Sequence, residues 1–318
     1  TSKIVVSPDE PVEIRRLELK NNGNNVETLE VTGCFEPVLS TDKQDYAHTA
    51  FNNLFLIFKE NGDGRLLIKR KKRDPKHKEV YAGVNLYTEG ETIGDVEYEI
   101  DKEKFMGKGN FKIPEAIKSS KPFSKSLGLV TDPCLAIKKT VKIAPNETVK
   151  LDLIVTAGYD EEKVTKMLNN YSNSNTIDKV FELSRAKTEA ETIYLGLKGK
   201  DIEKYQKMLS FLIFQNPMRK HVMENLPHRI YSQSELRKFG ISGDLPILLV
   251  KIKDANDMHV VQDALKAYEF FRSKNIKIDL VILNEEKNSY EHFIKFEVEN
   301  EIQNKQLAYL KNTLVEYL

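Results

Sequence analysis

Apolar and polar positions alternate with a period of two along the first half of the chain. Between Lys3 and about Ala157, turn residues separate short runs of this kind, as in antiparallel strands with one buried face. The clearest hairpin is NLFLIFKENGDGRLLIKRKK, whose residues 61–64 tolerate positive φ angles. We predict a second hairpin in AIKKTVKIAPNETVKLDLIV, around the turn APNE. This spacing of strands predicts an antiparallel β-sandwich over residues 1–157.

Near Asp160 the apolar period changes from two to three or four residues. In DIEKYQKMLSFLIF, apolar residues recur at helical spacing behind Asp201, a residue type suited to an N-cap. We therefore predict linker helices over residues 158–238. Residues 239–318 contain, in order, the strand PILLVKI, the helix NDMHVVQDALKAYEFFRSK and the strand IKIDLVIL, which is a βαβ unit with a parallel pair. The predicted fold class is mixed β and α/β: a sandwich, linker helices and a small α/β unit.

The charge balance argues against one class of partner. Lys and Arg total 49 and Asp and Glu total 48, so the chain lacks the broad positive potential of a nucleic-acid or anionic-membrane binder. No run approaches the roughly 20 apolar residues of a spanning helix. We expect a cytoplasmic location, no nucleic-acid partner and no direct membrane insertion.

Neither cysteines nor histidines show a ligand pattern. Cys34 and Cys134 lie far apart in the sequence and outside any CxxC or Cys/His spacing, so we expect no disulfide between them. The six histidines show no metal-ligand spacing. No metal and no cofactor are predicted.

The stretch DYAHTAFNNLF supplies the candidate substrate-binding residues, His48, Phe51 and Asn52. An aromatic face suits the apolar side of a pyranose, and an amide suits its hydroxyls. A structural role is the more common one for such residues, and the site is a hypothesis. The basic run LIKRKKRDPKHK could bind a phosphate or an acidic sugar. The solvated end of a hairpin is the more common use of such a run, since no aromatic residues are interleaved in it.

The stretch FGISGDLPILLVKI raises the question of whether Asp244 is a catalytic carboxylate. In phosphate loops the glycines precede a helix N-terminus, whereas here they lead into Pro246 and a strand. A structural turn is the better interpretation, with the Asp244 carboxylate accepting backbone hydrogen bonds and Ser242 doing the same more weakly. The chain contains no nucleophile elbow, Walker loop or Ser-His-Asp pattern, and no catalytic residue is predicted.

Several long motifs resemble one carbohydrate-active family. SQSELRKFGISGDLPILLVKI and ALKAYEFFRSKNIKIDLVILNE resemble the central region of cyclic β-1,2-glucan synthases and β-1,2-oligoglucan phosphorylases, in glycoside hydrolase family 94, formerly glycosyltransferase family 36. VVSPDEPVEIRRLELKNNGNNVETLEVTGCFEPVL, DYAHTAFNNLFL and DPCLAIKKTVKIAPNETVKLDLIVTAG are similar to the supersandwich domain of that family. The chain departs from the family at RKFG, where an aromatic-rich W.YG is more frequent.

The resemblance implies a supersandwich, linker helices and then an (α/α)6 barrel, which carries a catalytic aspartate and uses inorganic phosphate as co-substrate. The residues after 160 are too few for such a barrel. The resemblance therefore implies a fragment that is a non-catalytic scaffold or glucan-contacting region, with a β-glucan oligosaccharide and the rest of a parent chain as partners.

Two alternatives and the question of enzymatic activity stay open. One is a self-contained sugar phosphorylase or glycosyltransferase, with Asp244 as the acid and Arg237 contacting phosphate. The other is a protein-interaction or dimerisation module that forms a homodimer.

Overall fold

The computed structural model describes residues 1–108, 112–119, 121–214, 232–285, 293–304 and 315–317. By its contacts the chain divides into two compact units, Thr1–Thr188 and Glu189–Leu318. The division falls within the helix α5 (Ser174–Tyr194).

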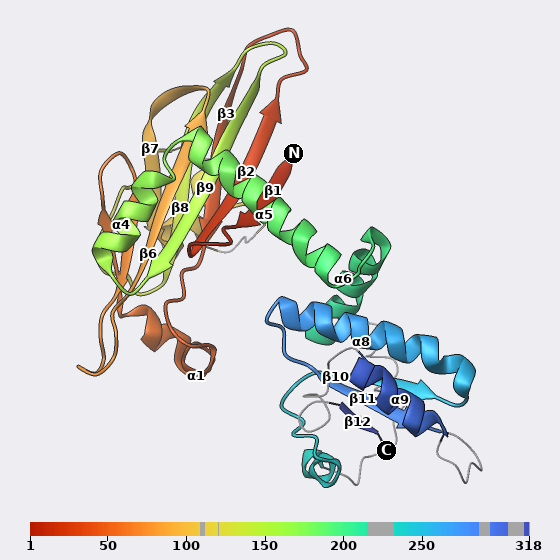
Figure 1. The fold of residues 1–318 in the computed structure, drawn as a ribbon. Coiled ribbons are helices and arrows are strands. Elements are labelled where there is room, and N and C mark those ends of the chain that lie inside the picture. The colour runs from red at the N-terminus through yellow and green to blue at the C-terminus, as the bar shows by residue number, and fades with distance from the viewer. Residues whose placement is uncertain (109–111, 120, 215–231, 286–292, 305–314, 318) are drawn as a thin grey trace. The chain divides into compact units, whose positions relative to one another are not determined.

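The first unit consists of two antiparallel sheets (Figure 1). The strand order of the larger sheet is β1 (Ser2–Val6), β2 (Val12–Lys20), β9 (Thr148–Gly158), β6 (Val80–Glu89), β5 (Leu66–Arg70) and β4 (Leu56–Glu60). The smaller sheet has the order β3 (Glu27–Phe35), β8 (Pro133–Ile143) and β7 (Glu91–Asp101). The main core of this unit lies between the inner faces of the two sheets, where large apolar side chains such as Phe58, Tyr98 and Leu135 are buried.

The first predicted hairpin is confirmed. β4 and β5 pair antiparallel, with Phe58 opposite Ile68. In the turn between them, Gly62, Asp63 and Gly64 have φ angles of 79°, 52° and 72°, the left-handed conformation that the Asn-Gly-Asp-Gly stretch allows.

The second predicted hairpin is wrong. β8 pairs with β3 and β7, whereas β9 pairs with β2 and β6, so the APNE connection passes from one sheet to the other. Apolar alternation indicates which face of a strand is buried but not which strand lies beside it. The apolar faces of β8 and β9 therefore meet across the core. Asn21 holds this crossover: its buried amide donates to Ile143 O at 3.0 Å, and its N–H donates to Glu147 O at 3.0 Å.

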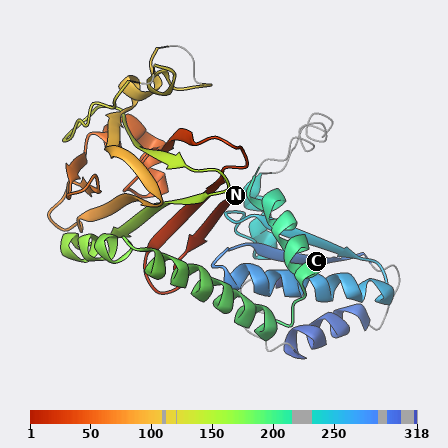
Figure 2. The same cartoon turned by 90° about the horizontal axis from the view of Figure 1, so that it is seen from above.

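Helices cover the outer face of the larger sheet. α4 (Glu161–Asn170) begins at Asp160, whose carboxylate caps the N–H of Lys163 at 2.9 Å. α4 and the start of α5 lie across this face in both views (Figures 1 and 2). Under α5, Arg16 forms two hydrogen bonds to Asp152, of 2.8 and 3.1 Å, and one of 2.6 Å to Asp178. The buried charges on the sheet are thereby paired.

Three short helices complete the first unit: α1 (Asp42–Asn53), α2 (Lys102–Met106) and α3 (Glu115–Lys118). Phe105 of α2 packs edge to face on Phe123 at 5.8 Å, and both cover Cys134 and Ala136 on the outer face of the smaller sheet. α1 lies between β3 and β4 in the sequence.

The second unit is α/β. Its three-stranded parallel sheet has the order β10 (Ile247–Ile252), β11 (Asp279–Asn284) and β12 (Val315–Tyr317). The helical elements of this unit are α6 (Gly199–Ile213), η1 (Gln233–Phe239), η2 (Ala255–Asp257), α8 (Met258–Ser273) and α9 (Phe293–Asn304). The predicted βαβ unit is confirmed as β10, α8 and β11, with Val250 opposite Ile282 in parallel register. Tyr205 of α6 packs into the same core and donates its hydroxyl to Asp263 of α8 at 2.9 Å.

The predicted fold class, antiparallel sandwich followed by helices and an α/β unit, is confirmed. The three-part division at 157/158 and 238/239 stays a prediction; by contacts, α4 belongs to the first unit and α6 to the second. Within the described residues, no helix combines the length and apolar character that crossing a membrane requires.

Candidate functional site

Helix α1 brings aromatic rings to the basic segment that follows β5. Phe51 and Phe55 pack edge to face with ring centroids 5.2 Å apart. The guanidinium of Arg73 lies 4.8 Å from the Phe51 centroid and 5.7 Å from that of Phe55, within range of a cation–π contact. Lys71 N–H donates to Phe55 O at 2.9 Å and joins the two segments. The aromatic residues that are missing from the basic run in sequence thus reach it from another element.

Asn52 is one of the three predicted substrate-binding residues, and it is buried. Its Oδ1 accepts a hydrogen bond of 2.7 Å from Arg70, and its backbone carbonyl accepts a second one of 3.2 Å from the same guanidinium. Its Nδ2 donates to the carbonyl of Gln44. Both ends of the amide are therefore occupied by protein groups, and the structure gives Asn52 a role in positioning Arg70.

The other two predicted residues lie on the surface of α1. His48 is exposed and has non-helical backbone angles, φ −153° and ψ 66°, which kink the helix. Phe51 leaves 45% of its surface exposed. The structure thus places His48, Phe51 and Asn52 on one helix, with Phe51 available to a ligand and beside Arg73.

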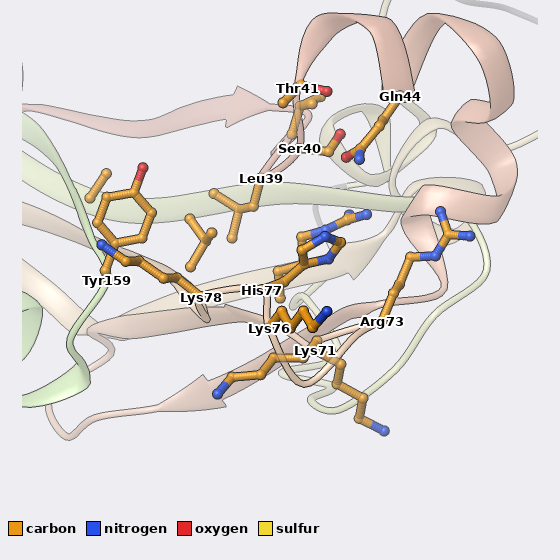
Figure 3. Close-up of a pocket in the computed structure, with 15 residues that line it drawn as sticks. Leu39, Ser40, Thr41, Gln44, Lys71, Arg73, Lys76, His77, Lys78 and Tyr159 are labelled. Atoms are coloured by element: carbon orange, nitrogen blue, oxygen red, sulfur yellow. The ribbon is translucent and has the colours of Figure 1, made fainter.

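A cavity of about 730 Å³ lies beside α1 (Figure 3). Its lining comes from three segments that are distant in sequence: the chain before and at the start of α1, the segment from the end of β5 to the start of β6, and the end of β9. The lining residues are Val38, Leu39, Ser40, Thr41, Gln44, Arg70, Lys71, Lys72, Arg73, Lys76, His77, Lys78, Val80, Ala157 and Tyr159. No Asp or Glu is among them.

Asp74 turns the basic segment back toward this cavity. Its carboxylate accepts a hydrogen bond of 2.8 Å from Lys76 N–H, and its carbonyl accepts one of 2.9 Å from His77 N–H. This is an ordinary use of Asp in a turn. The turn brings Lys76 and His77 to the cavity, opposite Ser40 and Thr41 (Figure 3).

The cavity is electropositive because its cations are largely unneutralised. Burial lowers the pKa of the Arg70 guanidinium from its ordinary value, and the nearby charge of Arg73 lowers it further. Lys69, just outside the cavity, pairs with Glu79 at 3.0 Å. Within the described part of the chain, no ion pair is formed by four of the lining cations, Lys71, Lys72, Arg73 and Lys76.

Residues 1–174 match the family model of the glycosyl hydrolase 94 supersandwich domain. The chain belongs to this family. Among known proteins it is similar to cyclic beta-(1,2)-glucan synthase NdvB of Rhizobium meliloti (strain 1021), with 25% identity over 310 residues. The match covers 97% of this chain and 11% of NdvB, so the chain spans about a tenth of the length of that relative. The cavity and α1 lie within the matched residues and therefore belong to the supersandwich domain.

Asp244 and Arg237, the residues of the alternative enzyme hypothesis, lie outside the supersandwich, in the second unit. Both are exposed. The expected hydrogen bond to the Asp244 carboxylate is wrong: no such bond is present in residues 232–285, and Asp244 instead donates its N–H to Ser242 Oγ at 3.1 Å. Gly243, with φ 73°, makes the tight turn that places these two groups together.

The sequence indicated part of this supersandwich site. The basic run and α1 were both visible as local patterns, but nothing in them predicted that they lie side by side. Ser40 and Tyr159 carried no signal at all, because each is a single polar or aromatic residue in a connecting segment. Within the described residues, no group of three His, Cys, Asp or Glu is placed to hold a metal ion.

Proposed function

We propose that this chain is a non-catalytic, glucan-contacting region of a longer protein, and that it binds a β-1,2-linked glucan at the surface of α1. The observation that carries the proposal is the half-exposed ring of Phe51 beside Arg73. A ring of this kind packs on the apolar face of a pyranose, and the guanidinium beside it donates hydrogen bonds to hydroxyls. Membership of the glycosyl hydrolase 94 family and similarity to a glucan synthase support the choice of glucan as the ligand class.

The neighbouring cavity wall supports the same proposal. Thr41 and Gln44 lie at the start of α1, ten and seven residues before Phe51 in the sequence, and line the cavity. Their hydroxyl and amide groups suit sugar hydroxyls. Asn52 contributes indirectly in this proposal, by holding Arg70 in place.

The test is isothermal titration of the purified chain with β-1,2-linked glucooligosaccharides. We expect binding by the wild-type chain, about tenfold weaker binding by Phe51→Ala, and little change in Phe51→Tyr, which keeps the ring. Phe211→Ala is the matched control, since Phe211 is also on a helix and is 49% exposed. Absence of binding, or equal affinity of Phe51→Ala and wild type, would contradict the proposal.

The same samples test the enzyme alternative. With inorganic phosphate added, a non-catalytic chain releases no glucose 1-phosphate from the oligosaccharide. Release of glucose 1-phosphate that is lost in Asp244→Asn would favour the self-contained phosphorylase instead.

A further inference from the structure

We propose that the cavity beside α1 binds a phosphorylated saccharide, with the phosphate group on the segment from Lys71 to Lys78 and the sugar against Tyr159. This claim goes beyond the binding of a neutral glucan at Phe51 and does not depend on it. Three independent features of the cavity carry it: its charge, its unpaired hydroxyl groups and its apolar wall.

The charge of the cavity is concentrated and unusual for this chain. Six Lys and Arg side chains and one His line it, without a carboxylate, although the whole chain has a formal net charge of only +1. A phosphate monoester carries about −1.5 to −2 charges at neutral pH and three acceptor oxygens. Lys72 and Lys76 are exposed and form no ion pair within the described residues, so their charges are available to such a group.

Hydroxyl groups face the basic segment across the cavity. Ser40 Oγ is buried and has no hydrogen-bond partner among the described residues. A buried hydroxyl without a partner is unfavourable, and rotation of the Ser40 side chain toward the cavity would let it donate to a ligand oxygen. Thr41 precedes α1 at the N-cap position, but its side chain makes no capping hydrogen bond. Figure 3 shows Ser40, Thr41 and Gln44 on one side of the cavity and Lys71, Lys76 and His77 on the other.

The side of the cavity formed by Tyr159 and its apolar neighbours suits a sugar. The cavity as a whole is too large for phosphate alone. Tyr159 is 68% exposed at the end of β9, and Lys78 Nζ lies 5.4 Å from the centroid of its ring. Leu39, Val80 and Ala157 add an apolar surface. The volume of about 730 Å³ is in the range of sites that take whole small molecules. A free phosphate would leave most of it, including the tyrosine, unused.

The test is isothermal titration of the full chain with glucose 6-phosphate, glucose and inorganic phosphate at low ionic strength. We expect glucose 6-phosphate to bind at least tenfold more tightly than either of the other two, and added salt to weaken it. Lys72→Gln/Lys76→Gln should lose at least tenfold in affinity for glucose 6-phosphate. Lys187→Gln, which removes an exposed lysine of α5 outside the cavity, should lose none.

Two further variants test the cavity hydroxyl and control for a folding defect. Ser40→Ala should weaken glucose 6-phosphate binding several-fold without lowering the melting temperature, because the hydroxyl has no protein partner to lose. Phe211→Ala, which changes a residue of α6 that does not line the cavity, should leave glucose 6-phosphate affinity unchanged. The proposal is overturned if glucose 6-phosphate binds no better than glucose or phosphate, if the double variant binds like wild type, or if Lys187→Gln is equally impaired.

Discussion

Cys34 and Cys134 lie on the same face of two adjacent strands, although their positions in the sequence are far apart. Cys34 of β3 stands directly opposite Ala136 of β8, and Cys134 is two residues from Ala136 along β8. The two thiols are close enough to influence each other's ionisation, and they are not joined as a disulfide. The expectation of two free thiols is confirmed, but the distance between them in the sequence is a poor guide to their distance in the fold.

This contact predicts unequal reactivity. The neighbouring Cys134 thiol lowers the pKa of the exposed Cys34 thiol, whereas the Cys34 thiol and burial raise that of Cys134. Iodoacetamide should therefore alkylate Cys34 first in the folded chain, because the thiolate is the reactive form. Peptide mass spectrometry after brief labelling measures this. Equal labelling of both residues, or a non-reduced chain two hydrogens lighter than expected, would contradict it.

A second prediction concerns acid stability and Glu99. Burial alone would raise the pKa of Glu99, but hydrogen bonds from Ser124 Oγ at 2.6 Å, Ser126 Oγ at 3.0 Å and the Asp101 N–H at 3.0 Å hold it below its ordinary value. A carboxylate with a lowered folded-state pKa contributes stability above its unfolded pKa, and this contribution is lost as the pH falls through the folded value.

The wild-type chain should therefore lose free energy of unfolding between about pH 5 and pH 3, and Glu99→Gln should lose less over the same interval. Urea unfolding at both pH values gives the comparison. Glu27→Gln, which changes an exposed glutamate at the start of β3, is the control and should follow wild type. An identical loss in Glu99→Gln and wild type would show that Glu99 is not responsible.

The prediction for Asn52 decides between positioning and ligand contact. Asn52→Ala removes both amide contacts and leaves the buried Arg70 guanidinium short of a partner. We expect a loss of about 1.5–3 kcal/mol in the free energy of unfolding, the range for a hydrogen bond to a charged group. Chemical denaturation measures it. Unchanged stability together with reduced glucan affinity would instead make Asn52 a direct sugar contact.

Features of the fold that follow from local sequence patterns could be predicted, whereas contacts between segments distant in the sequence could not. Hydrophobic periodicity predicted the sandwich, the β4–β5 hairpin and the βαβ unit, because each follows from a local pattern of buried positions. It did not predict that β8 and β9 lie in different sheets, since the pattern fixes a face and not a neighbour. Asn52 was predicted to contact the substrate, and its burial against Arg70 could not be foreseen because that contact depends on how α1 and β5 lie together in the fold.

In the turn at Ser242, the structure makes Ser242 more important for stability than Asp244, whereas the sequence suggested the opposite order. Ser242 Oγ accepts the N–H of Asp244, and Asp244 itself is exposed. Ser242→Ala should therefore cost about 0.5–1.5 kcal/mol. Asp244→Ala should stay within about 0.5 kcal/mol of wild type, as is usual for surface substitutions. Thermal unfolding of both variants tests the order, and a larger loss in Asp244→Ala would restore the original interpretation.

The central claim is that glucan binds to the supersandwich at α1 and the adjoining basic segment. Hydrogen–deuterium exchange with and without a β-1,2-linked glucooligosaccharide locates the ligand directly, because bound segments exchange more slowly. We expect slower exchange in residues 42–55 and 71–80 and no change in the β10–α8–β11 unit. Unchanged exchange throughout, or slowing confined to residues 247–284, would contradict it.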